Sequence, residues 1–157
     1  MLKQNDKAPV HIKIINEEGK NIELGDLVKQ SPIVLYFYPK DNTPGCTLEA
    51  CDFRDYNKEI SKLGYIIYGV SKDTIDSHNR FKTKHNLNFP LLSDPDLKIH
   101  DAFGVIVNKS MFGRKYKGTQ RSTFIINTDG LITKVWPRVK ASGHAKEVYD
   151  YIKEINN

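Results

Sequence analysis

Cysteine is scarce in this chain: only two of its 157 residues are Cys, and both lie in one short segment, at Cys46 and Cys51. A secreted mini-protein held together by disulfides would need more cysteines in a smaller chain. A four-ligand zinc site would need more Cys or well-spaced His, whereas the five histidines are scattered. We interpret each histidine as a surface or packing residue. An isolated close pair of cysteines in an intracellular protein points towards redox chemistry.

Long apolar runs are also missing. A run such as Ile33 to Tyr38 is far too short to span a bilayer, and residues 1–7 contain no apolar stretch that could serve as a signal peptide. No repeat, low-complexity tract or Pro/Gly-rich linker divides the chain, and its length suits one hydrophobic core. We therefore expect a single domain over residues 1–157, located in the cytoplasm and with no membrane partner.

Acidic residues are outnumbered, and the formal net charge is +5. Basic residues crowd at Lys109, Arg114, Lys115, Lys117 and Arg121. Such a cluster can bind nucleic acid by releasing counterions, but no helix-turn-helix, RNA-binding sheet motif or zinc-finger spacing accompanies it. We favour a solvated, glycine-containing loop and expect no nucleic-acid partner. Another interpretation is that the charge steers acidic partners or anionic substrates.

What the chain does have is a regular alternation of strand and helix patterns. Val10 to Ile15 and Asn21 to Glu23 flank Glu18-Gly19 and predict an N-terminal hairpin. Continuous apolar runs and helical periodicity mark the other elements. The strands are predicted at 33–38, 65–70, 89–92, 122–126 and 131–135, and the helices at 44–63, 75–85, 97–103 and 143–155. The last helix is expected to bury Val148, Tyr151, Ile152 and Ile155.

This order of elements predicts the fold class. It is that of an α/β, thioredoxin-like fold with an N-terminal β-hairpin extension and a central mixed sheet flanked by helices. In open α/β sheets, functional sites lie at the carboxyl ends of the strands. The segment Tyr38 to Cys51 begins at such an end and contains both cysteines. It is therefore where we expect chemistry.

Cys46 is expected in the first turn of the helix that begins at Pro44. Thr43 suits the N-cap position, and Pro44 suits the first helical position because its missing N–H would be unpaired there. Unpaired backbone N–H groups and the positive end of the helix dipole favour a thiolate over a thiol at Cys46. This pattern predicts a nucleophile, with a disulfide, an acyl group or a peroxide as the possible electrophile.

Cys51 follows five residues after Cys46, a spacing that matters for any disulfide. In a regular helix their Cα atoms would be about 8.6 Å apart, whereas a disulfide generally needs them within about 7 Å. The pair can bridge only if the first turns of the helix unwind. An inert, partly buried Cys51 remains an equal alternative from the residues alone.

The same segment resembles the peroxiredoxins, in particular the bacterioferritin-comigratory or PrxQ-type branch. Pro39, Thr43 and Cys46 match the family's Pro-x-x-x-Thr-x-x-Cys motif, and the branch's longer string is matched from Lys40 to Asp55. The segments 92–95, 121–124 and 143–145 are also similar to that branch. The resemblance covers essentially the whole chain.

The resemblance implies a thiol-dependent peroxidase without metal, haem or flavin. Cys46 would be oxidised by a hydroperoxide to a sulfenic acid, and Cys51 would resolve it as an intrachain disulfide. A thioredoxin- or glutaredoxin-type reductant would then recycle the protein, for which a monomer is expected. The resemblance implies four other site residues. Thr43 would place the thiolate and the peroxide, and Arg121 would supply a fixed positive charge. Pro39 would shield the pocket, and Glu49 would orient neighbouring polar groups.

Three other classes of function stay open from the sequence, and one of them is a structural role with inert thiols. A thiol-disulfide oxidoreductase of the same fold would be expected to carry Cys-x-x-Cys, which is absent. A non-catalytic binding protein would use the basic loop instead of the cysteines.

Overall fold

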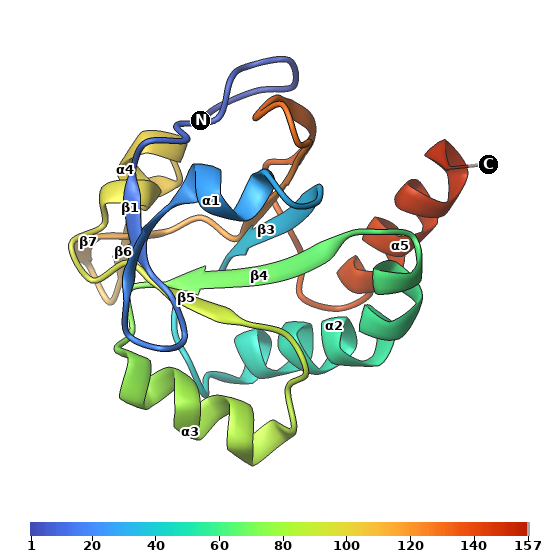
Figure 1. The fold of residues 1–157 in the computed structure, drawn as a ribbon. Coiled ribbons are helices and arrows are strands. Elements are labelled where there is room, and N and C mark those ends of the chain that lie inside the picture. Colours follow the sequence, from blue (N-terminus) through green and yellow to red (C-terminus); the bar gives the residue numbers. More distant parts are fainter. Residues whose placement is uncertain (157) are drawn as a thin grey trace.

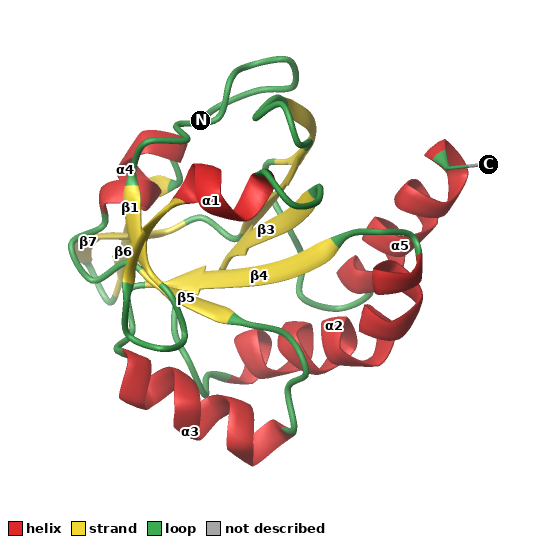
Figure 2. Ribbon diagram, in the orientation of Figure 1, coloured by secondary structure: helices red, strands yellow, loops and turns green. Residues whose placement is uncertain are grey.

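The computed structural model describes residues 1–156. Within them, a seven-stranded mixed sheet has the strand order β2-β1-β5-β4-β3-β8-β9 and forms the middle layer, with helices on both of its faces (Figures 1 and 2). The predicted α/β class with a central mixed sheet and an N-terminal hairpin is confirmed. Its strands are β1 (Lys13–Ile15), β2 (Asn21–Glu23), β3 (Ile33–Phe37), β4 (Ile66–Ser71), β5 (Leu91–Ser93), β8 (Ser122–Ile126) and β9 (Ile132–Trp136).

Strand β3 shows why helices are needed on both sides of the sheet. Successive strand residues point to opposite faces, so a strand that is apolar throughout must be covered twice. Val34 and Tyr36 pack into one core cluster, whereas Leu35 and Phe37 pack into the other. Helices α2 (Pro44–Lys62), α3 (Ile75–His85) and α5 (His144–Ile155) cover the first face, and α1 (Leu24–Val28) and α4 (Lys98–Phe103) cover the second.

Helix bounds agree closely with the sequence pattern where a stop signal is present. Helix α2 ends at Lys62, and Gly64 follows with φ +90°, a conformation in which glycine is not strained. The five-residue α1 was not predicted, because it is too short to show a helical period. The prediction that Ile155 is buried is wrong: its side chain is 49% exposed, because α5 extends past the sheet at its C-terminal end (Figure 1).

The basic segment after α4 is a second correction. It is not a loop but a β-hairpin of β6 (Ile106–Met111) and β7 (Arg114–Thr119), paired in register from Ile106↔Thr119 to Met111↔Arg114. Its polar residues lie on both faces, so no apolar alternation marks it in the sequence. Backbone pairing through a two-residue turn therefore defines it, rather than burial.

Three of the five histidines do more than pack. His78, His100 and His144 are buried, and each has a ring nitrogen within 2.9 Å of a carboxylate oxygen, of Asp41, Asp94 and Glu147 respectively. Buried polar side chains are normally hydrogen-bonded, and each pair gives its histidine one partner, whereas Nε2 of His100 has none among the described residues. The expectation of simple surface or packing residues was therefore incomplete.

None of the helices among residues 1–156 combines the length and the apolar character that crossing a membrane would require.

Candidate active site

Cys46 lies where the chain passes from the central strand β3 into α2. Thr43 occupies the N-cap with extended backbone, and Pro44 is the first helical residue, as predicted. The thiol of Cys46 therefore sits in the first turn, and only 1% of the residue is exposed. Unpaired N–H groups at this helix start favour a negative charge on the sulfur.

Arg121 reaches this sulfur from a distant part of the chain. Strand β8 runs antiparallel to β3 with Ser122 opposite Phe37, so the residue before β8 lies at the carboxyl end of β3. Nη2 of Arg121 lies 3.4 Å from Sγ of Cys46. A Cβ atom at Gly45 would lie 3.3 Å from the same Nη2, so glycine leaves room for the guanidinium.

Glu49 is the second partner of this guanidinium. It lies one helical turn after Cys46 on the same buried side of α2, and its Oε1 accepts a hydrogen bond from Nη1 of Arg121 at 2.6 Å. Burial raises the pKa of Glu49 to about 7, although the charge and hydrogen bond of Arg121 act in the opposite direction. The other carboxylate oxygen, Oε2, has no hydrogen-bond partner among the described residues.

The guanidinium stays charged in this setting. Burial lowers the pKa of Arg121, but Glu49 and Cys46 outweigh that effect and the net result is a pKa above the ordinary value. A fixed, fork-shaped cation therefore faces both a carboxylate and the sulfur. Because it has several N–H groups, the same side chain can stabilise an anionic sulfur and a neighbouring oxygen on which charge develops.

Thr43 and Pro39 border the same end of the sheet. The Thr43 hydroxyl donates to the carbonyl oxygen of Lys40 at 2.9 Å and does not cap the helix with its side chain. Its oxygen keeps lone pairs with which it can accept a further hydrogen bond. Pro39 is half-buried and lines a cavity of about 880 Å³ that extends towards β6 and β7.

Cys51 lies farther along α2 and is not adjacent to Cys46 in this folded helix. Both cysteines are free thiols, and Cys51 is half-buried. Its sulfur lies 3.7 Å from Nη1 of Arg54, which also donates to the carbonyl oxygen of His85 at 2.7 Å. The helix is continuous from Pro44 to Lys62, so bridging the two sulfurs requires that its first turns open.

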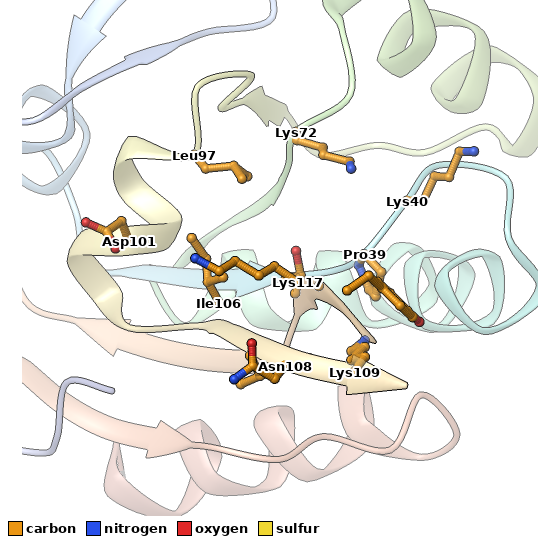
Figure 3. A pocket seen from close by; sticks show the side chains of 13 residues that line it. Pro39, Lys40, Lys72, Leu97, Asp101, Ile106, Asn108, Lys109 and Lys117 are labelled. Atoms are coloured by element: carbon orange, nitrogen blue, oxygen red, sulfur yellow. The ribbon is translucent and has the colours of Figure 1, made fainter. Parts of the chain in front are cut away.

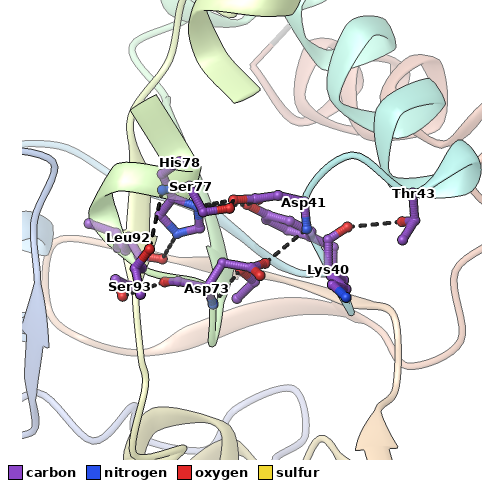
Figure 4. Close-up of polar contacts among 11 residues, drawn as sticks. Lys40, Asp41, Thr43, Asp73, Ser77, His78, Leu92 and Ser93 are labelled. Atoms are coloured by element: carbon purple, nitrogen blue, oxygen red, sulfur yellow. Dashed lines mark hydrogen bonds and ion pairs between the residues drawn. The ribbon is translucent and has the colours of Figure 1, made fainter. Parts of the chain in front are cut away.

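A buried polar network anchors the loop that precedes α2, and no pattern in the sequence indicated it (Figure 4). Asp41 accepts hydrogen bonds from Tyr38 and Ser77 and lies 2.7 Å from Nδ1 of His78, while its backbone N–H donates to Asp73. Nε2 of His78 lies 2.9 Å from the carbonyl oxygen of Leu92.

The ligand atoms of Asp41, Asp73 and His78 lie within 4.8 Å of one another, a spacing compatible with a metal ion. Their hydrogen bonds to one another and to their neighbours already account for this clustering. We therefore interpret these hydrogen bonds as structural, because they hold the loop before α2 against α3 and the end of β4.

Known proteins are similar to this chain over most of its length. Residues 5–135 match the model of the AhpC/TSA family. The chain is 50% identical over 142 residues to a putative peroxiredoxin bcp of Coxiella burnetii, covering 90% of this chain and 93% of the relative. It is 45% identical to the peroxiredoxin Bcp of Bacillus subtilis, covering 96% and 94% of the two chains.

Solved structures show the same similarity over the full length. The bacterioferritin comigratory protein of Xanthomonas campestris superimposes with a TM-score of 0.89 at 35% identity, covering 99% of this chain and all of the other. A cysteine-to-serine mutant of Xylella fastidiosa PrxQ gives a TM-score of 0.92 at 34% identity, covering 100% and 99% of the two chains. The chain therefore belongs to the AhpC/TSA family, among its Bcp or PrxQ peroxiredoxins, which are thiol-dependent peroxidases.

Proposed function

We propose that Cys46 is the residue that reacts with the peroxide. Its thiolate attacks one oxygen of a hydroperoxide, the O–O bond breaks, and the leaving oxygen departs as an alkoxide or hydroxide that takes up a proton. The sulfur becomes a sulfenic acid. Hydrogen peroxide and organic hydroperoxides are the expected substrates, and alkyl peroxide reduction is the activity with which the Xanthomonas relative is described.

The surrounding residues have distinct roles in this proposal. Arg121 stabilises the thiolate and the oxygen on which charge develops, and Glu49 holds the guanidinium in place. Thr43 accepts a hydrogen bond from the peroxide, because its own proton is already donated to Lys40. Pro39 shields the pocket from solvent.

Cys51 is proposed to resolve the sulfenic acid, which makes the protein an atypical 2-Cys peroxiredoxin. Its thiolate attacks the Cys46 sulfur, an intrachain disulfide forms, and the sulfenic oxygen leaves as water after protonation. The network around Asp41 keeps the preceding loop attached to α3, so the opening is confined to the helix that follows.

A thioredoxin- or glutaredoxin-type dithiol protein is proposed to reduce this disulfide. Two electrons then pass to the cysteines while the dithiol becomes a disulfide. The cytoplasm keeps such reductants available, and we place the protein there. Because both reacting cysteines belong to one chain, a monomer is sufficient for the cycle.

The observation that carries the proposal is the contact of 3.4 Å between the buried Cys46 sulfur and the Arg121 guanidinium at a helix start. Stopped-flow fluorescence with hydrogen peroxide tests it, followed by mass spectrometry of the product. We expect fast second-order oxidation that ends in a Cys46–Cys51 disulfide. Oxidation at the rate of an ordinary free thiol would contradict the role of Cys46.

The role of Cys51 has its own test. In a Cys51→Ser variant, the sulfenic acid at Cys46 should persist and react with a dimedone-type probe. The matched control is Cys46→Ser, which should give no adduct. If Cys51→Ser also gave no adduct after one equivalent of peroxide, Cys51 would not be the resolving residue.

A further inference from the structure

The basic residues of the hairpin β6–β7 form no ion pair with any described residue. Between Asp101 and Asp129 the chain has no acidic residue, yet this stretch contains Lys109, Arg114, Lys115, Lys117 and Arg121. Of these, only Arg121 belongs to an ion pair among the described residues. Strands β6 and β7 pair only with each other, in a small sheet separate from the central one. We call residues 106–119 the basic hairpin.

Phe112 lies at the tip of the basic hairpin, where both its backbone conformation and the exposure of its apolar side chain are unfavourable. Phe112 is 98% exposed, and its φ is +53°, followed by Gly113 at +77°. Two-residue turns with positive φ prefer Asn, Asp or Gly at the first position, and a bulky side chain there is strained. Met111 beside it is 56% exposed. Phe112 is accounted for at this exposed position if its side chain contacts another molecule.

The end of strand β7 also lies close to the reactive cysteine. Strand β7 ends at Thr119, two residues before Arg121, which contacts the Cys46 sulfur. The cavity of about 880 Å³ lies between the hairpin and the loops that follow β3 and β4, and its lining includes Pro39. Figure 3 shows Lys40 and Lys72 on the side of those loops and Lys109 on the hairpin. Of the proposed site residues, Pro39 lines this cavity, so a molecule that contacts the hairpin and enters the cavity lies at the edge of the site.

We propose that the basic hairpin is the docking surface for the protein reductant, a dithiol protein with an apolar contact and carboxylates near its reactive sulfur. The inference rests on the proposed catalytic cycle. Redox encounters use small, transient interfaces, which a hairpin tip and one adjoining cavity can supply. Protein interfaces are enriched in aromatic residues, Met and Arg, and the hairpin tip presents Met111, Phe112 and Arg114. The unpaired basic residues accelerate association with an acidic partner.

Docking brings the partner's thiols to the Cys46–Cys51 disulfide for thiol–disulfide exchange. One thiolate of the partner attacks a sulfur of the Cys46–Cys51 disulfide, and a mixed disulfide forms while the other cysteine leaves as a thiolate. The partner's second thiol then displaces it. Two electrons and two protons pass to the peroxidase, and the partner is released as a disulfide.

The test compares a protein reductant with a small one. Phe112→Asn removes the apolar contact but suits the turn, and Lys115→Glu reverses one exposed charge without touching the site. Steady-state peroxidase turnover is measured with an acidic bacterial thioredoxin, its reductase and NADPH, and separately with dithiothreitol. We expect the KM for thioredoxin to rise about fivefold or more in both variants. Turnover with dithiothreitol and the stopped-flow oxidation by hydrogen peroxide should be unchanged.

Lys153→Glu is the charge-matched control and should leave the KM for thioredoxin unchanged. Lys153 belongs to α5, which Figure 1 shows on the opposite side of the molecule from β7. An equal increase of KM in this control, or no increase in Phe112→Asn and Lys115→Glu, would overturn the proposal. The proposal would also be overturned if the enzyme reduced peroxide with dithiothreitol as the reductant but with neither thioredoxin nor glutaredoxin. Salt-sensitive binding to DNA or to anionic vesicles that Lys115→Glu abolishes, with an unchanged KM, would assign the hairpin to that partner instead. Slow oxidation of the wild-type chain by peroxide is a different result, because it contradicts the cycle itself.

Discussion

Arg121 and Glu49 form a partly buried ion pair, with 2.6 Å between Nη1 and Oε1. The carboxylate is completely buried, and its second oxygen has no hydrogen-bond partner among the described residues. An incompletely satisfied carboxylate in a low-dielectric site is unfavourable when charged, which explains why its pKa is raised despite the adjacent cation. The guanidinium that we propose to act on Cys46 is therefore positioned by a group whose pKa is about 7.

Replacing Glu49 by Gln should flatten the pH dependence of stability. The carboxyl has a pKa of about 7 in the folded protein against 4.5 as the ordinary value, so the native state binds the extra proton between these values. The free energy of unfolding then falls as pH rises through this window, by about 1–3 kcal/mol. Urea unfolding at several pH values, in a Cys46→Ser background that removes thiol titration, measures this. Identical pH profiles with and without Glu49 would contradict it.

Loss of the Arg121 charge should slow the reaction of Cys46 with peroxide. In Arg121→Gln we expect the second-order rate constant to fall about 10²–10³-fold, because a donor aimed at developing negative charge is lost. Stopped-flow oxidation measures the effect. Arg114→Gln removes an exposed arginine from the hairpin and should react like the wild type. A wild-type rate in Arg121→Gln would remove this guanidinium from the mechanism.

Oxidation should loosen the start of α2. The Cys46–Cys51 disulfide cannot form in the intact helix, so residues 44–52 should exchange their amide hydrogens faster in the oxidised protein than in the reduced one. Hydrogen-exchange mass spectrometry of both redox states tests this. Strand β3 is the internal control, because its residues are buried in the central sheet and should keep their protection. Equal protection of 44–52 in both states would rule out the opening step.

Breaking the Asp41 network should cost far more stability than breaking a surface ion pair. Asp41→Ala leaves His78, Tyr38 and Ser77 without their shared acceptor, and we expect a loss of about 3–5 kcal/mol in the free energy of unfolding. Glu18→Ala disrupts an exposed pair with Lys20 and should cost at most about 1 kcal/mol. Urea denaturation of both variants makes the comparison. Equal losses would mean that the loop is not fastened by Asp41.

Two isoleucines on α5 give a matched test of the core. Ile152 is completely buried, whereas Ile155 is 49% exposed. Ile152→Ala should destabilise the fold by about 2–5 kcal/mol, because it removes apolar contacts and leaves a cavity. Ile155→Ala should cost less than about 1 kcal/mol. Thermal or urea unfolding distinguishes them, and a larger loss for Ile155 would mean that this end of the helix is covered in solution.

The sequence by itself determined the features that depend on neighbouring residues. Thr43 and Pro44 start α2 and place Cys46 in its first turn, and Gly64 follows its end. The five-residue spacing to Cys51 already excludes a disulfide within the intact helix. Continuous apolar runs marked the buried strands of the sheet. Each of these outcomes follows from backbone geometry over a few turns, which the tertiary structure does not alter.

Only the tertiary structure decided which distant side chains meet. Arg121 reaches Cys46 across 75 positions because β8 runs antiparallel to β3, and the sequence indicated it only through its resemblance to a family motif. The pairing of Asp41 with His78, the raised pKa of Glu49 and the basic hairpin left no periodic signal. These features depend on burial, on the local dielectric and on strand pairing, which are properties of contacts between segments and not of any one segment.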